Sequence, residues 1–279
     1  MGYLLEVTDY VHEDALTHLS AAETRLSEVL ARPKRIALGC IAALTGLGWL
    51  ALALMMSGGA SSDWDAWQAL CQPVLAGTWG TFAVALPMWA AMTLAMMLPT
   101  AGPMILTYAE IADTAARKCE PVVSPLVLTA GYVAVWLGFA IVAAALQWVL
   151  ARAGLLDGGN TSRLAGGAIF IAAGLYQFTA LKQSCLTQCQ RPFPFFFSNW
   201  TEERAGVFRL GLRQGLYCLG CCWAMMLVMF AVGTMNVVWM AALGVLMTIE
   251  KLSTTARFSR AVGAAFIAIG SVMVVWSLV

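Results

Sequence analysis

The sequence predicts an all-α protein, a polytopic transmembrane helical bundle of about seven spans. The first observation behind this is composition: 61% of the 279 residues are hydrophobic and 11% are charged, with a mean hydropathy of +0.78. A soluble domain usually carries about a quarter charged residues, so this much apolar side chain indicates a lipid environment. The second observation is that the apolar residues form runs close to the roughly 20 residues that cross a bilayer as a helix.

Seven apolar runs follow a polar start, so we expect two parts. Residues 1–35 should be a polar, partly helical cytoplasmic segment, and residues 36–279 a transmembrane helical domain. The runs lie at about 36–56, 79–98, 123–150, 164–182, 212–232, 236–250 and 261–278. The sixth run is too short to cross the hydrocarbon core comfortably. The alternative is therefore six spans with residues 236–250 as a re-entrant segment.

Two proline-containing stretches are expected to interrupt helices, because proline lacks the backbone N–H that a helix interior needs. Pro99 and Pro103 should end the second span near the inner surface, and carbonyls freed beside them could line a cavity. The run from Pro192 to Phe197, PFPFFF, should be a loop that dips into the headgroup region.

The basic residues are distributed unevenly over the two sides of the seven-span topology. With the N-terminus inside, all 16 basic residues except Arg152 and Arg163 fall on inside segments. Inside segments of membrane proteins are enriched in lysine and arginine, so this pattern predicts a cytoplasmic N-terminus and an outside C-terminus. We expect a multi-pass protein of the inner (plasma) membrane. The net charge of +1 gives no reason to expect a nucleic-acid partner.

Sulfur dominates the polar chemistry that remains within the spans. The stretch CLGCCWAMMLVM contains Cys218, Cys221, Cys222 and Met225 as candidate metal ligands, at spacings that place most of its sulfurs along one face of a helix. Thiolates and thioethers are soft donors that suit Cu(I), with zinc a weaker candidate. The alternative is ordinary packing, since methionine fills core gaps and cysteine behaves as a small hydrophobic residue.

Two further groups of sulfur residues could join this stretch. Cys185 and Cys189 share a helical face at the inner end of the fourth span, at the membrane depth expected for the first group. Met92, Met96 and Met97 lie in the second span, where packing against neighbouring helices is the alternative role.

Few ionisable residues fall within or beside the spans. Glu250 could pair with Lys182 or Lys251, or serve as a metal or proton partner, whereas both lysines are expected to snorkel to the headgroups. No histidine lies in any span, which argues against bis-histidine haem and histidine-rich copper catalysis. The sequence also contains no P-loop motif for nucleotide hydrolysis.

The same residues resemble a known family. Three stretches, MWAAMTLAMMLPTAGPM (88–104), GLYQFTALKQSCLTQCQRP (174–192) and GLYCLGCCWAMMLVMFAVGTMNVVWMAALGVLMTIEKL (215–252), are similar to an uncharacterised bacterial family of predicted metal-binding integral membrane proteins, a domain of unknown function. The resemblance implies a multi-span helical protein with a metal site. It implies the five cysteines named above as site residues, with Met92, Met96, Met97, Met225 and Glu250 as companions.

Three functions are compatible with these features. The leading hypothesis is an integral membrane protein that binds Cu(I) for copper handling, transport or metallocofactor assembly, with the lipid bilayer and other membrane or metal-delivery proteins as partners. The second is a membrane thiol/disulfide or metal-dependent oxidoreductase. The third is a structural accessory subunit whose sulfurs only pack. The sequence leaves open whether the protein is an enzyme, and what its oligomeric state is.

Overall fold

The structure, a computed structural model, describes residues 33–57, 79–118, 122–154, 156–157, 160–233, 236–253 and 256–278. The expected helical segment within residues 1–32 and the loop after the first span lie outside these residues. The prediction of an all-helical fold is confirmed for the described part, where a hairpin of two two-residue strands is the exception. The elements are α3 (Pro33–Ser57), α5 (Trp79–Arg117), α6 (Pro125–Arg152), β1 (Leu156–Asp157), β2 (Asn160–Thr161), α7 (Arg163–Tyr176), α8 (Ala180–Gln190), α9 (Pro192–Ser198), α10 (Arg204–Leu227), α11 (Met229–Val232), α12 (Val237–Leu252) and α13 (Ala256–Leu278).

Five helical stretches of the described residues are long and apolar enough to cross a membrane: α3, α5, α6, α10 continued by α11, and α13. Helices α7 and α8 together have the required length and are bent by 66°, so they count as a sixth if they form one broken span. Helix α12 has only 16 residues, as its short apolar run suggested. The count of seven full spans is not confirmed, and the helix lengths agree with the six-span alternative.

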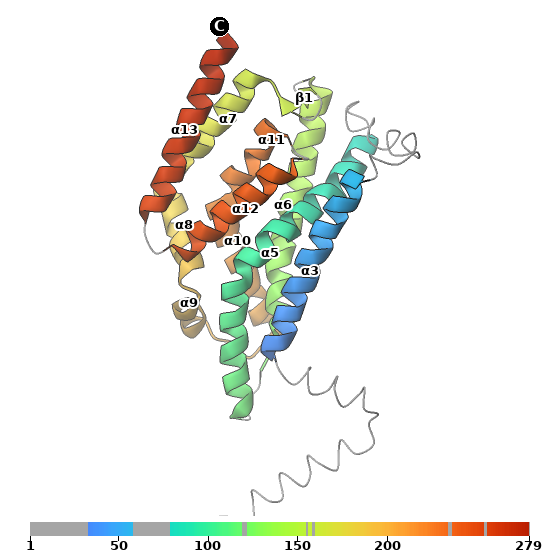
Figure 1. The fold of residues 1–279 in the computed structure, drawn as a ribbon. Helices are drawn as coiled ribbons and strands as arrows, with labels where there is room; N and C mark the ends of the chain where they lie inside the picture. The colour runs from blue at the N-terminus through green and yellow to red at the C-terminus, as the bar shows by residue number, and fades with distance from the viewer. Residues whose placement is uncertain are drawn as a thin grey trace, which may run out of the picture.

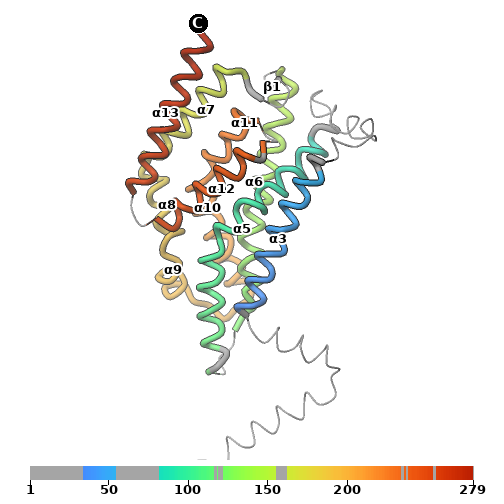
Figure 2. Tube along the Cα trace, in the orientation of Figure 1, coloured from blue at the N-terminus to red at the C-terminus, as the bar shows by residue number. Residues whose placement is uncertain are grey.

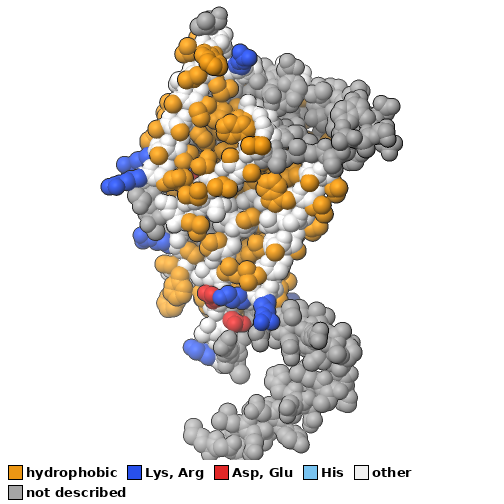
Figure 3. All heavy atoms as spheres, in the orientation of Figure 1, with side chains coloured by type: hydrophobic (Ala, Val, Ile, Leu, Met, Phe, Trp, Pro, Cys, Tyr) orange, Lys and Arg blue, Asp and Glu red, His pale blue; other side chains and the backbone are white. Residues whose placement is uncertain are grey.

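The helices form one bundle whose two ends are distinct (Figure 1). Helix α3 begins at the lower end and α13 ends at the upper end, and the backbone trace shows α3 beside α5 and α7 beside α13 (Figure 2). On the face drawn in Figure 3, hydrophobic side chains cover most of the described surface, whereas charged side chains gather mainly at the lower end and along one edge. Such a surface is compatible with insertion into a membrane.

Helix α5 continues past the prolines that were expected to end it. It runs from Trp79 to Arg117 with Pro87, Pro99 and Pro103 inside, and it changes direction along its length (Figure 1). The expectation that Pro99 and Pro103 break the helix was wrong. A proline removes one backbone hydrogen bond and kinks a helix, but neighbouring helices hold such a kink in place within a bundle. The hydroxyl of Thr107 donates to the carbonyl of Pro103, in the turn that follows the last proline.

The phenylalanine-rich run was expected to be a loop, and this was also wrong, because it forms the short helix α9. Its two prolines lie in the first turn, where a helix does not use the missing N–H groups. Phe195 and Phe196 are buried, and the ring of Phe196 packs edge-on against Tyr108 of α5. Phe193 and Phe197 face outward and stack on each other.

Helices α6 and α10 cross with their backbones in contact, because glycines face each other. A methyl group added at Gly131 would lie 2.3 Å from the carbonyl oxygen of Phe208, and one added at Gly211 would lie 2.1 Å from that of Leu128. Small residues allow this close approach between apolar helices. The crossing places Tyr132, the residue after Gly131, against the cysteine-rich part of α10.

Candidate metal centre

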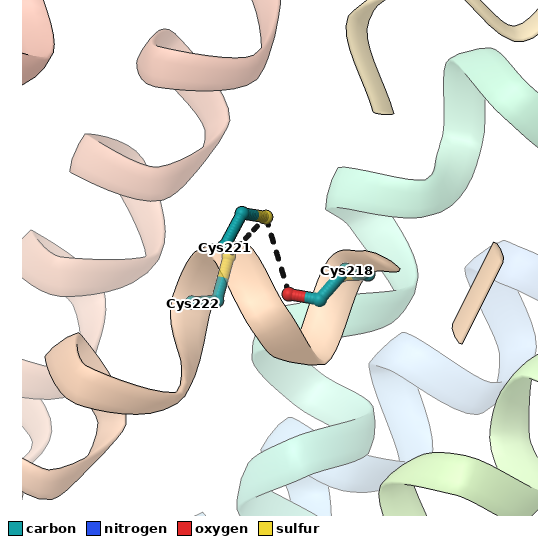
Figure 4. Close-up of side chains that lie close together, drawn as sticks. All are labelled: Cys218, Cys221 and Cys222. Atoms are coloured by element: carbon teal, nitrogen blue, oxygen red, sulfur yellow. Dashed lines mark hydrogen bonds between the residues drawn. The ribbon is translucent and has the colours of Figure 1, made fainter. Parts of the chain in front are cut away.

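Three cysteines of α10 bring their sulfur atoms together inside the bundle. The Sγ atoms of Cys218, Cys221 and Cys222 all lie within 4.8 Å of one another, and all three residues are buried. The Sγ atoms of Cys221 and Cys222 are 3.3 Å apart, and the Cys221 thiol donates to the carbonyl of Cys218 at 3.1 Å (Figure 4). Two sulfurs that share one ion at about 2.3 Å each lie at most about 4.6 Å apart. The spacing therefore suits one small ion. Among the described residues, these three cysteines are the group of potential ligand side chains whose ligand atoms lie this close together.

Helix α8 adds sulfur to this group, as the shared depth of the two cysteine motifs suggested. The Sγ of Cys189 lies 3.9 Å from the Sγ of Cys221. Cys185 packs directly on α10, since a methyl group added at Gly220 would lie 2.6 Å from its Sγ. The hydroxyl of Tyr176 donates to the carbonyl of Gly220 and fixes the end of α7 at the same point. The structure thus brings both cysteine motifs to one place.

Cys218 has a cation and a hydroxyl group beside its sulfur. The Nζ of Lys251 donates to the Sγ of Cys218 at 3.0 Å and to the hydroxyl of Thr100 at 2.6 Å. The hydroxyl of Tyr132 lies 3.0 Å from the same Sγ and donates to the carbonyl of Met97 at 3.1 Å. The expectation that Lys251 snorkels to the headgroups was wrong. Its positive charge lies where a buried thiolate, the metal-binding form of cysteine, would need compensation.

Glu250 pairs with Lys182, one of the two partners proposed for it. The Nζ of Lys182 lies 2.8 Å from Oε2 of Glu250. The side chain of Lys182 is 0% exposed and that of Glu250 is 3% exposed. The expectation that Lys182 extends to the headgroups was therefore wrong too. The amide of Gln190 donates to the carbonyls of Glu250 and Ser253 at the end of α12. Glu250 lies outside the group of gathered ligating atoms. These contacts hold α8, with its cysteines, against α12.

The four candidate methionines lie in the core around this region. Met92, Met96, Met97 and Met225 are 0–3% exposed. Met96 lies beside α12, where a methyl group added at Gly244 would be 3.9 Å from its Cε. A metal-binding role for these four thioethers stays a prediction.

A cavity of about 20 Å³ lies next to Cys218, where helices α5, α6, α8, α10 and α12 meet. Met104 of α5, Cys189 and Gln214 line it together with Cys218. Gln214 is 2% exposed, and its Oε1 has no hydrogen-bond partner among the described residues.

The sequence did not single out Met104, Tyr132 or Gln214 as site residues. Met104 stands in a methionine-rich string, but it follows Pro103, where α5 was expected to have ended. No local signal marks Tyr132 or Gln214, because their roles depend on the α6–α10 crossing.

The fold and the site define a helical bundle with a buried cluster of soft metal-ligating groups. The chain belongs to the copper chaperone family PpoB2, whose family model matches residues 86–273, about two thirds of the chain. Comparison with curated proteins and with solved structures finds no match. The matched range contains every residue of the site, from Met92 to Lys251, and agrees with the resemblance to a metal-related family.

Proposed function

We propose that the protein binds Cu(I) at Cys218, Cys221 and Cys222, with Cys189 as a further ligand, and passes it on for copper homeostasis or assembly of a copper cofactor. The observation that carries the proposal is the set of three buried sulfur atoms within 4.8 Å of one another, in a chain of a copper chaperone family.

The donor set favours Cu(I) over harder ions. Sulfur ligands surround the position, and carboxylates are absent from the gathered group within the described residues. The charge is balanced for Cu(I) when two of the cysteines are thiolates, since two thiolates, one Cu(I) and the ammonium of Lys251, which lies 3.0 Å from Cys218, sum to zero.

The proposed setting is the inner membrane of a bacterium, with the N-terminus cytoplasmic and the C-terminus outside. Support comes from the five membrane-length helices and from the uneven distribution of basic residues. In this setting the cysteines would capture copper arriving from the inner side, and residues 1–35 would form a cytoplasmic segment. The thioethers of Met92, Met96, Met97 and Met225 would extend the soft-donor path within the bundle.

The test is the copper content of protein purified without oxygen in the presence of Cu(I). The wild type should carry about one Cu(I) per chain, and Cys218→Ser combined with Cys222→Ser should reduce this to near zero, because two of three clustered ligands are lost. Elemental analysis with protein quantification measures the ratio.

Cys40 provides the matched control, since it is a free, half-buried cysteine on α3, outside the cluster. Cys40→Ser should load copper like the wild type. Full copper content in the double cluster variant, or an equal loss in Cys40→Ser, would contradict the proposed site.

A thiol–disulfide function is the second candidate, based on one observation: Cys189 and Cys221 approach to 3.9 Å from different helices. Thiol labelling of isolated membranes before and after mild oxidation separates this from copper binding. A redox function requires that labelling of these two residues falls on oxidation and recovers on reduction.

A further inference from the structure

We propose that an open groove at the lower end of the bundle, between α5 and α9, is the docking site of the chain's own N-terminal segment, residues 14–30, which binds there as an amphipathic helix. The segment lies outside the described residues, whereas both walls of the groove lie within them. The inference is independent of copper binding and goes beyond the proposed function.

One face of α5 and one face of α9 form the groove. The lining residues of α5 recur every three or four positions over about three helical turns, from Thr107 to Lys118. Phe193 and Phe197, one turn apart on α9, line the other side and are 57% and 80% exposed. The space between the two helices has a volume of about 570 Å³. An apolar groove between two helices fits the apolar face of a third helix laid along it.

The N-terminal segment joins the bundle beside this groove. Lys34, in the first turn of α3, forms an ion pair with Glu110, and Glu110 lines the groove. Below this pair, α5 extends beyond the start of α3 (Figure 1). Residue 32, the last before α3, is therefore close enough for the segment to turn back along the exposed end of α5.

The sequence of the segment has the pattern that such a groove requires. As a helix it would present all of its leucines on one face: Leu16, Leu19, Leu26 and Leu30. Most of its charged residues would lie on the opposite face: Asp14, Arg25 and Glu28. The leucine face would cover the exposed phenylalanines of α9.

Glu23 is the exception, and it identifies the register. It lies on the leucine face, four residues after Leu19 and three before Leu26, so a docked helix must offer it a cation. The ammonium of Lys118 is at the far end of the groove, eight residues after Glu110 and thus about 12 Å along α5. With Leu30 beside Glu110, Glu23 lies seven residues or about 10 Å along the docked helix, almost level with Lys118.

The charge of the segment favours a protein groove over the lipid surface. Residues 1–32 contain six acidic and two basic side chains. Helices that lie on a membrane surface are usually rich in lysine and arginine, because these residues are attracted to anionic lipids. An acidic amphipathic segment is therefore better matched to the groove with Lys118.

Photo-crosslinking of the full-length protein in lipid nanodiscs tests the contact. The photoreactive residue p-benzoylphenylalanine replaces Leu26, on the leucine face, or Glu28, on the opposite face, as the matched control. Irradiation should link position 26 to peptides of α5 or α9 within the same chain, as identified by mass spectrometry. Position 28 should give little of this product, because it would face away from the groove.

A charge exchange tests the register. Lys118→Glu places two carboxylates together and should lower the crosslink yield from position 26 by about fivefold, the upper range for an exposed ion pair. Combining it with Glu23→Lys reverses the pair and should restore the yield. Lys118 is exposed, so neither variant should change the fold of the bundle.

A crosslink within one chain that is lost in Lys118→Glu and recovered in the double variant supports the proposal. Links between two chains would show that the groove receives the segment of a second copy, and links only to lipid would show that lipid fills it. Equal yields from positions 26 and 28 would show that no face is selected. Each of these three results overturns the proposal, and none of them depends on whether the protein loads copper.

Discussion

Lys182→Met should lower the free energy of unfolding by about 3–5 kcal/mol, because it leaves a buried carboxylate without its cation. Glu250 is 3% exposed, and its Oε2 accepts from Lys182 at 2.8 Å. Its other oxygen, Oε1, already has no hydrogen-bond partner among the described residues. Chemical unfolding in detergent micelles, followed by the tryptophan signal, measures the change.

The double variant Lys182→Met with Glu250→Leu tests the cause. Removing both charges should recover most of the lost stability, since apolar residues of similar volume often replace a buried ion pair without cost. Lys34→Met is the surface control, because the pair of Lys34 with Glu110 is exposed at 48% and 60%. It should change stability very little. Equal effects of Lys34→Met and Lys182→Met would show that burial of the Lys182–Glu250 pair does not cause the loss of stability.

Gly131→Ala should be strongly destabilising, with a loss of about 3 kcal/mol in unfolding free energy. The added methyl group would meet the carbonyl oxygen of Phe208 at 2.3 Å, a backbone atom that cannot move aside alone. Helices α6 and α10 would have to separate. Because the contact from Tyr132 to Cys218 spans the same two helices, copper affinity should fall together with stability. Unfolding in micelles and competition with a Cu(I) chelator measure the two effects.

Gly138→Ala controls for the general effect of alanine in a helix. It lies on α6, two turns after Gly131, and a methyl group there would meet nothing within 4 Å. Alanine favours helix over glycine by up to about 1 kcal/mol, so this variant should be as stable as the wild type or more so. If the two alanine variants unfold alike, α6 and α10 do not cross as closely as the structure has them.

The cysteine site could be predicted in part because its signal is local. Cys218 and Cys222 are four residues apart, as are Cys185 and Cys189, and helical periodicity alone places each pair on one face. That the pairs would meet followed from the alternating direction of the spans. The 3.9 Å approach of Cys189 to Cys221 shows that the two cysteine motifs do meet, while their role as metal ligands stays a prediction.

The partners of the sulfurs could not be predicted, because they are contributed by distant parts of the chain. Lys251 stands at the end of an apolar run, where a lysine normally extends to the headgroups. It turns inward instead, because the hydroxyl of Thr100 and the sulfur of Cys218 lie at hydrogen-bond distance. Only the packing of α12 against α5 and α10 creates that environment, and the spacing of residues along the sequence does not show how these helices pack.

The proline rule failed at α5 for a related reason. Pro99 and Pro103 would end a helix that stands alone in water, where lost hydrogen bonds and a kink are not compensated. Within the bundle α5 is packed against α3 and α6, and it tolerates both residues. This is also what keeps Met104 on the helix, facing the cavity beside Cys218.

The contact between Lys251 and Cys218 has a consequence for the protein without copper. A carrier spends part of every cycle empty, and an empty site of bare thiolates would repel itself and weaken the fold. Here one sulfur faces a positive charge at 3.0 Å. On the proposed copper function, this contact would stabilise the unloaded site, and the bundle would stay folded after copper is released.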